Sequence, residues 1–128
     1  MLDDINILKI SSAMARHAAD RHQLIAQNIA NADTNNFKAK DLEPFGEAYS
    51  RLSKRQDNFG KPLSAGQSNA SWREETISGR GIESPNGNTV SIEDQMMRSI
   101  EAQQSFEAAT TIYKKTIDIL RTSLGRGA

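Results

Sequence analysis

Two long stretches of the chain contain neither glycine nor proline, and they lie at its two ends. One runs from Met1 to Glu43 and the other from Asn88 to Leu124, whereas all three prolines and six of the eight glycines fall between them. Glycine weakens a helix through backbone entropy, and proline weakens it through a missing donor and a ring clash. The sequence therefore predicts two helical arms joined by a broken middle segment.

The C-terminal arm has apolar residues at alternating spacings of three and four, which is typical of a helix that packs along one seam. Ser91 is a favourable N-cap, and Asp94 stands three residues later as a weak capping box. At 1.5 Å per residue this helix is about 50 Å long, so we expect its seam to lie inside the fold or at contacts with other chains. The predicted seam consists of Ile92, Met96, Phe106, Tyr113, Ile117, Leu120 and Leu124, with Ser99, Gln103 and Thr110 in the same register.

The N-terminal arm is predicted to be helical from Leu2 to Asn31. Its apolar seam is wide near the start of the helix, and later it becomes narrow and consists of smaller side chains. Small side chains let a second helix approach closely, so we expect the two arms to pair as an antiparallel or near-antiparallel hairpin. The seam predicted here consists of Leu8, Ala15, Ala18, Ile25 and Ile29, with Ser11 and His22 in the same register.

The middle segment is predicted to begin with a short helix, because Leu42, Phe45, Tyr49 and Leu52 follow helical spacing. Asp41 is its expected cap, and Pro44 is tolerated in a first turn. From Gln56 to Gly87 the chain is polar and rich in glycine, serine and asparagine, with residues 72–77 as a possible short strand. Its scattered apolar anchors are Phe59, Leu63, Trp72, Ile77 and Ile82.

These patterns predict a mainly α fold. Long N- and C-terminal helices pair as a coiled-coil hairpin, and a short helix with an irregular, partly β segment fills the middle. We expect three parts: the N-terminal helix with its turn (1–37), the middle region (38–88) and the C-terminal helix (89–128), of which the first and last form one structural unit.

Composition excludes several classes of protein. The 128 residues include 16 basic and 16 acidic side chains, without the basic stripe that nucleic-acid binding requires. Cysteine is absent, which excludes disulfides and thiolate metal sites. No run approaches the ~20 apolar residues of a membrane span, and the acidic start Met1–Asp4 does not resemble a secretory signal. Aromatic residues make up only 5%, which indicates that partners complete the core.

A search for catalytic chemistry finds weak candidates only. His17 and His22 are five residues apart and do not share a helix face as an i, i+4 pair would; His17 with Asp20 leaves a metal site short of ligands. The neighbours Glu74 and Glu75 are better explained as solvated surface. Residues 78–81 are glycine-rich but lack the lysine of a phosphate loop. We expect no catalytic, metal or cofactor site.

Two polar stretches remain, and both combine a tight turn with a helix end. Residues 28–38 end the first helix in a run of Asn, Asp and Thr and then reach an aromatic residue. Short polar side chains of this kind bond to nearby backbone and tolerate left-handed conformations, so they make a defined turn. Residues 86–93 form a turn that leads into the capped C-terminal helix.

The first stretch resembles the signature of flagellar axial proteins, N-I-A-N-x-x-T-P-G-[FY]-K. It departs from that signature at Asn35 and Asn36, where the family has Pro-Gly, and Asn36 keeps the ability to adopt a positive φ. Residues 86–90, followed by an acidic helix start and Met96-Met97, resemble the proximal-rod members of the flagellar basal-body rod protein family. The matching positions are Asn28, Ile29, Ala30, Asn31, Thr34, Phe37, Lys38, Asn88, Thr89 and Val90.

The resemblance implies a structural subunit of the proximal rod, located in the periplasmic part of the flagellar basal body. It implies export through the flagellar type III channel without a cleaved signal. The implied partners are other copies of the chain, other rod subunits, the junction between the membrane ring and the rod, and export apparatus proteins. The competing interpretation is a soluble helical-hairpin adapter or export chaperone that binds a partner helix; an enzyme is the remotest alternative.

Overall fold

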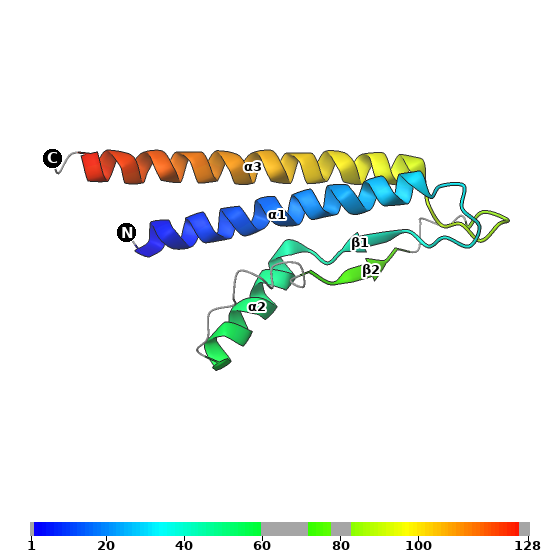
Figure 1. Cartoon of the computed structure of the whole chain (residues 1–128), viewed down its shortest axis with the longest axis horizontal. Helices are drawn as coiled ribbons and strands as arrows, with labels where there is room; N and C mark the ends of the chain where they lie inside the picture. Colours follow the sequence, from blue (N-terminus) through cyan, green and yellow to red (C-terminus); the bar gives the residue numbers. More distant parts are fainter. Residues whose placement is uncertain (1, 60–71, 78–82, 126–128) are drawn as a thin grey trace. The chain divides into compact units, whose positions relative to one another are not determined.

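The computed structural model describes residues 2–59, 72–77 and 83–125. Along the chain its elements are α1 (Leu2–Ala30), β1 (Lys40–Leu42), α2 (Phe45–Phe59), β2 (Glu74–Thr76) and α3 (Ile92–Gly125) (Figure 1). Helix α1 has 29 residues and α3 has 34, as expected for two arms without internal glycine or proline. The predicted fold class is confirmed: two long terminal helices, a short helix and a small β segment.

The chain forms two compact units. One contains residues 2–23 and 96–125, and in it α1 and α3 run antiparallel, as the hairpin prediction requires (Figure 1). An ion pair of 3.2 Å joins Arg21 Nη2 to Glu101 Oε2 across these helices. The other unit contains residues 24–95 and holds both strands, α2, and the adjoining ends of the long helices. The division into 1–37, 38–88 and 89–128 stays a prediction.

Helix α1 buries the face that its seam predicted. Ser11, Ala18 and Ile25 are buried at intervals of seven residues, and Leu8 is half-buried on the same line. Ile29 departs from this pattern because it is exposed. Most of the buried residues on this face are small, which suits a close helix–helix approach.

Helix α3 buries a different line from the predicted seam. We call Gln95, Ala102, Ala109 and Thr116 the inner line; all four are buried and they are spaced seven residues apart. The predicted seam lies beside the inner line: Ile117 and Leu120 are half-buried. Its other members are exposed within this chain: Ile92, Met96, Phe106, Tyr113 and Leu124. Their role in contacts with other chains stays a prediction.

The start of the middle segment differs from the expected helix. Leu42 and Asp41 belong to strand β1, and α2 begins only at Phe45. The cause is Pro44, since a proline pushes the preceding residue away from helical geometry. Pro44 instead contributes its carbonyl to the first helical bond, from Ala48 N at 3.1 Å. Helix α2 also continues through residues 56–59, which we had expected to be irregular.

The short strand predicted within residues 72–77 is confirmed as β2. It pairs antiparallel with β1, with Lys40 opposite Thr76 and Leu42 opposite Glu74. Beside this ribbon the Phe45 ring lies 5.7 Å from Tyr49 and 5.9 Å from Trp72, centroid to centroid. The proposed anchors Leu63 and Ile82 lie outside the described residues. None of the described helices has the length and apolarity needed to cross a membrane.

Candidate functional site

The polar turn after α1 is built from the side chains that the sequence singled out. Asn31 Nδ2 donates to Gln27 O at 2.8 Å, beside the backbone bond from Asn31 N to the same carbonyl at 3.1 Å. Thr34 Oγ1 donates to Asn31 Oδ1 at 3.0 Å. Asn36 has φ 60°, which confirms the expected left-handed conformation at this position. The turn therefore has a defined path although it lacks the family's Pro-Gly.

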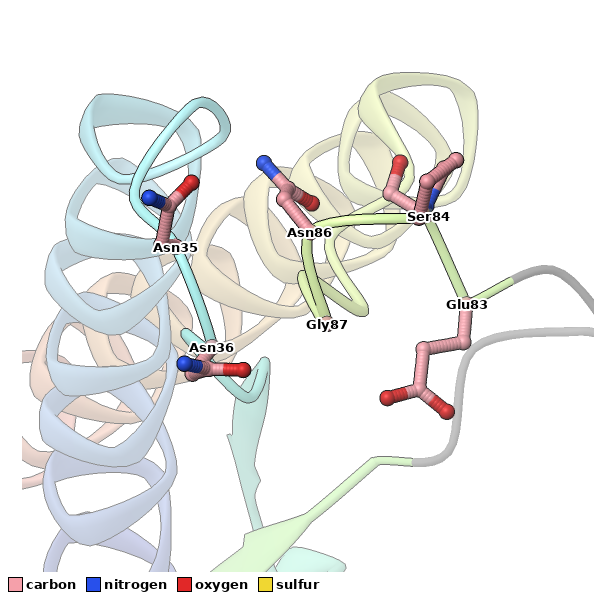
Figure 2. Close-up of a pocket in the computed structure, with 7 residues that line it drawn as sticks. Asn35, Asn36, Glu83, Ser84, Asn86 and Gly87 are labelled. Carbon is pink, nitrogen blue, oxygen red and sulfur yellow. The ribbon is translucent and has the colours of Figure 1, made fainter.

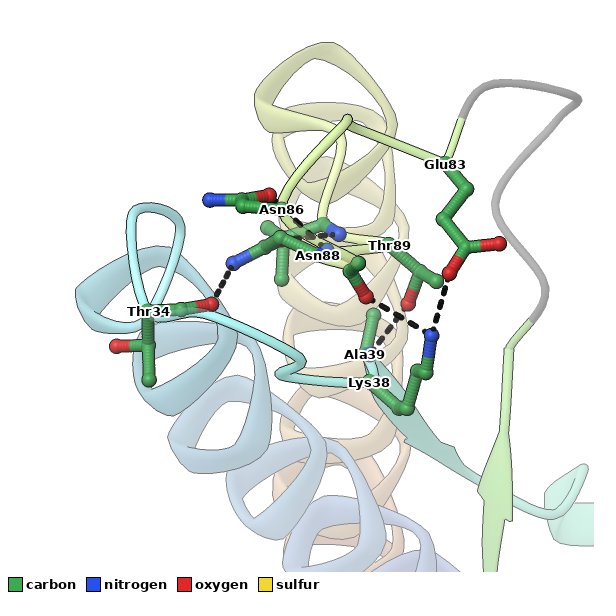
Figure 3. A network of polar contacts seen from close by, with 9 residues as sticks. Thr34, Lys38, Ala39, Glu83, Asn86, Asn88 and Thr89 are labelled. Carbon is green, nitrogen blue, oxygen red and sulfur yellow. Dashed lines mark hydrogen bonds and ion pairs between the residues drawn. The ribbon is translucent and has the colours of Figure 1, made fainter.

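Asn88, which lies in the second polar stretch, forms hydrogen bonds to this turn (Figure 3). Its side chain is 2% exposed, and its Nδ2 donates to Asn31 O at 2.8 Å and to Thr34 O at 2.7 Å. Its Oδ1 accepts from Val90 N at 2.8 Å. One buried amide thus ties the turn at the end of α1 to the segment that leads into α3.

Further bonds run alongside this clamp. Thr89 N donates to Phe37 O at 3.0 Å, and Thr89 Oγ1 accepts from Ala39 N at 2.9 Å. Lys38 Nζ donates to Glu83 Oε1 at 2.9 Å and to Gly87 O at 2.8 Å (Figure 3). The two polar stretches predicted separately from the sequence therefore form one hydrogen-bonded cluster, which we call the signature knot: residues 28–40 with 83–95.

Asn28 anchors the other end of the signature knot. It is fully buried, and its Nδ2 donates to Lys40 O at 2.7 Å and to Gln95 Oε1 at 3.0 Å. Its Oδ1 accepts from Lys40 N at 3.2 Å. A single side chain on α1 thereby bonds to strand β1 and to the first turn of α3.

The surface of the knot carries an open, polar hollow lined by residues 35–36 and 83–87 (Figure 2). Gly87 is one of the lining residues and has φ +79°, and a Cβ placed there would be 2.3 Å from Asn36 Oδ1. Gly87 N also donates to Ser84 O at 2.8 Å. Only glycine combines this backbone conformation with this close approach.

A second polar group holds the start of α2 against the β ribbon. Glu43 is buried, and its Oε1 accepts from Arg73 N at 2.9 Å and from Arg51 Nη2. The sequence did not predict this group, because a glutamate before a proline and an arginine in an amphipathic helix are both common and do not indicate burial. Gln95 was missed for the same reason, and nothing in the pattern around it signals burial.

The structure thus brings most of the predicted signature positions together: Asn28, Asn31, Thr34, Phe37, Lys38, Asn88 and Thr89 all bond within the signature knot. Val90 is half-buried and takes part through its backbone amide alone. Ile29 and Ala30 are exposed on the last turn of α1. The knot therefore has two faces, a bonded interior and an outer face on which the large apolar side chains of Ile29 and Ile92 are exposed.

Potential metal ligands are dispersed in the part of the chain that the structure describes, where no group of three or more His, Asp or Glu side chains could hold a metal ion. His17 is buried on α1 and His22 is half-buried. The polar groups of the signature knot bond mainly to backbone and to one another, which fixes geometry.

Comparison with known proteins gives one informative relative. No family model matches the chain. Over 119 residues the chain is 26% identical to the flagellar basal body rod protein FlgB of Agrobacterium fabrum, and the aligned region covers 88% of each protein. This similarity confirms the resemblance to rod proteins of the FlgB type that residues 28–38 and 86–90 indicated.

Proposed function

We propose, from this relationship to the FlgB-type flagellar rod proteins, that the chain is a structural subunit of the proximal rod of the flagellar basal body. The observation that carries the proposal is a relative named as a rod protein, aligned along 88% of both chains. The two stretches that suggested the family from sequence are bonded to each other in the signature knot.

The exposed surface of α3 supports assembly through the terminal helices. Nine large apolar side chains of this helix are at least two-fifths exposed, with Met96 at 59% and Leu124 at 63%. Apolar surface of this extent marks interaction sites. We call this group the exposed apolar set: Ile92, Met96, Met97, Ile100, Phe106, Ile112, Tyr113, Ile119 and Leu124.

The proposed mode of assembly is helical. Contacts between different faces of identical or similar subunits build an open helix when the rotation does not close into a ring. Such contacts would cover the exposed apolar set with the terminal helices of neighbouring copies and of other rod subunits. A subunit at the proximal end also meets the junction with the membrane ring and the export apparatus, and these are its remaining proposed partners.

This role needs no catalysis. The protein contributes shape and contacts, and it reaches the periplasmic rod by flagellar export. The finer parts of the proposal are the proximal position, the export route and the individual neighbours. They rest on the family resemblance.

Mass spectrometry of purified hook–basal bodies after a high-salt wash tests the proposal. We expect the chain at a few copies per structure, retained through the wash as an integral subunit. Intact basal bodies that lack the chain, together with a cytosolic complex of fixed stoichiometry, would contradict the proposal and favour the adapter or export chaperone. A distal rod fraction that contains the chain would overturn only the proximal position.

A further inference from the structure

Asn86 and Gly87 form the single Asn-Gly pair of the chain. Asparagine is thermally labile, because the backbone nitrogen of the next residue attacks the side-chain carbonyl and displaces ammonia. A side chain on that next residue hinders the attack, whereas glycine has no Cβ and leaves the backbone free to reach the required geometry. Asn86 is also exposed, so water reaches it. Sequence and exposure together mark Asn86 as a reactive asparagine.

The signature knot restrains both reacting groups in the turn that Figure 2 shows. The attacking nitrogen, Gly87 N, must release its proton, and that proton is held in a hydrogen bond to Ser84 O at 2.8 Å. The side-chain carbonyl, Asn86 Oδ1, accepts from Asn88 N at 3.1 Å, which fixes the orientation of the amide. The main-chain carbonyl of Asn86 accepts from Asn36 N at 2.9 Å. Ring formation requires Asn86 and Gly87 to move relative to each other, so the closed knot opposes the reaction.

Opening of the knot therefore controls the reaction. The segment that contains Asn86 is joined to the turn after α1 by Asn88 Nδ2, which lies 2.8 Å from Asn31 O and 2.7 Å from Thr34 O. A group protected in this way reacts through the opened fraction of molecules, and its rate follows the population of that fraction when closing is faster than the chemistry. Local opening and closing take microseconds to seconds, and cyclisation of asparagine is far slower. The rate of the reaction thus reports how often the knot is open.

We propose that Asn86 is a deamidation site that reacts only while the signature knot is open, and that its isoaspartate product prevents the knot from closing again. In the first step Gly87 N forms a bond to Asn86 Cγ, the bond from Cγ to the side-chain nitrogen breaks, and ammonia leaves with the proton of Gly87 N. Water then opens the resulting succinimide at one of its two carbonyls, which gives aspartate or isoaspartate. The sequence of steps consumes only water and needs no oxidant or reductant.

The two products differ in their effect on the knot. Aspartate leaves the main chain unchanged and keeps a side-chain oxygen as acceptor for Asn88 N. Isoaspartate routes the main chain through Cβ and Cγ of residue 86 and so adds one main-chain atom before Gly87. The added atom displaces Gly87 and Asn88 relative to the turn after α1, where hydrogen bonds tolerate little change in distance. A molecule that reacts while open is therefore lost from the closed population.

Peptide mapping by mass spectrometry, after incubation of the full chain at mildly alkaline pH, tests the first part. We expect deamidation at Asn86 to be at least about tenfold faster in urea than in the folded protein. Asn35, which is exposed in the same knot but precedes Asn36, is the internal control and should react far more slowly than Asn86 in urea. A folded protein that reacts at Asn86 as fast as the unfolded chain would overturn the proposal.

The variant Asn88→Ala connects the reaction to the knot. It removes the side-chain bonds to Asn31 O and Thr34 O, so we expect deamidation at Asn86 to become at least roughly tenfold faster than in the parent. The matched variant Asn35→Ala should leave the rate unchanged. A folded Asn88→Ala protein with the rate of the parent would overturn control by the knot. The comparison within the parent needs no substitution, so the test holds even where Asn88→Ala does not fold.

Hydrogen exchange after removal of urea tests the second part. Chains with isoaspartate at position 86, separated by chromatography, are expected to lose protection of Asn36 N and Asn88 N. The variant Asn86→Asp represents the other product and is expected to retain this protection. Isoaspartate chains that regain protection would overturn the second part, and so would its loss in Asn86→Asp, because charge would then be the cause. Both parts concern the isolated chain and do not depend on the proposed function.

Discussion

The signature knot and the helical unit are stabilised in different ways. In the knot, buried amides such as Asn28 and Asn88 make several directional bonds each, at 2.7–3.2 Å. In the helical unit, small buried side chains pack between two long helices, whose larger apolar residues remain largely exposed. Hydrogen bonds of defined direction specify one local geometry within a single chain. A helix pair that buries little and exposes much leaves apolar surface available for contacts with neighbours, which the proposed rod subunit requires.

Among the substitutions that test this difference between the two regions, Asn88→Ala is expected to cause the largest loss of stability. The substitution removes the side-chain bonds to Asn31 O and Thr34 O, which keep their backbone bonds from Thr34 N at 3.1 Å and Phe37 N at 3.3 Å, and it leaves Val90 N without its acceptor. Each lost hydrogen bond contributes about 1 kcal/mol, so we expect a loss of about 3 kcal/mol in the free energy of unfolding by urea titration. The control Asn35→Ala, at an exposed position of the same turn, should change it by less than about 0.5 kcal/mol. Equal effects would mean that the knot is not held by its buried amides.

Gly87→Ala is expected to have the next largest effect. The φ of +79° and the 2.3 Å approach to Asn36 Oδ1 both disfavour a side chain, and such strain costs about 1–3 kcal/mol. Gly46→Ala is the matched control, because nothing lies within 4 Å of its added Cβ and alanine favours helix α2 by roughly 0.5–1 kcal/mol. Thermal unfolding should therefore move in opposite directions for the two variants. A Gly87→Ala protein as stable as the parent would contradict the tight turn described here.

The smallest effect is expected from Glu101→Ala in the helical unit. Its ion pair with Arg21 spans the two helices at 3.2 Å, but the Glu101 side chain is 60% exposed. Exposed pairs contribute about 0–1 kcal/mol, so the unfolding midpoint should barely move, and added salt should reduce the difference further. A loss comparable to that of Asn88→Ala would show that directional polar contacts also hold the helical unit, and the contrast between the two regions would fail.

Sequence reasoning succeeded where a local rule has a strong physical cause. Missing glycine and proline located both long helices, and the small seam of α1 matched its buried face at Ser11, Ala18 and Ile25. The propensity of asparagine for positive φ anticipated Asn36. Sequence reasoning also identified the two polar stretches, although it did not predict that the two stretches bond to each other.

The failures have equally specific causes. On α3 the predicted seam, which includes Phe106 and Tyr113, is expected inside the fold or at contacts with other chains, and within this chain Ala102 and Ala109 are buried whereas these two residues are exposed. The size of a side chain does not reveal which face packs within the chain, and the contacts of the seam with other chains stay a prediction. The short helix was placed too early because helical spacing at Leu42 outweighed the effect of Pro44 on the residue before it. Gln95 and Glu43 are buried through long-range partners that no local pattern predicts.

Replacement of one exposed aromatic residue tests the central claim most directly. Phe106 is 41% exposed, so Phe106→Asp should leave the isolated chain folded by circular dichroism. In the assembled rod an aspartate at this position would be buried without a partner, which is not tolerated. We therefore expect loss of rod assembly and of motility in the source bacterium, with Gln104→Asp as an exposed control on the same helix that retains both. Normal motility of the Phe106→Asp strain would contradict assembly through the exposed face of α3.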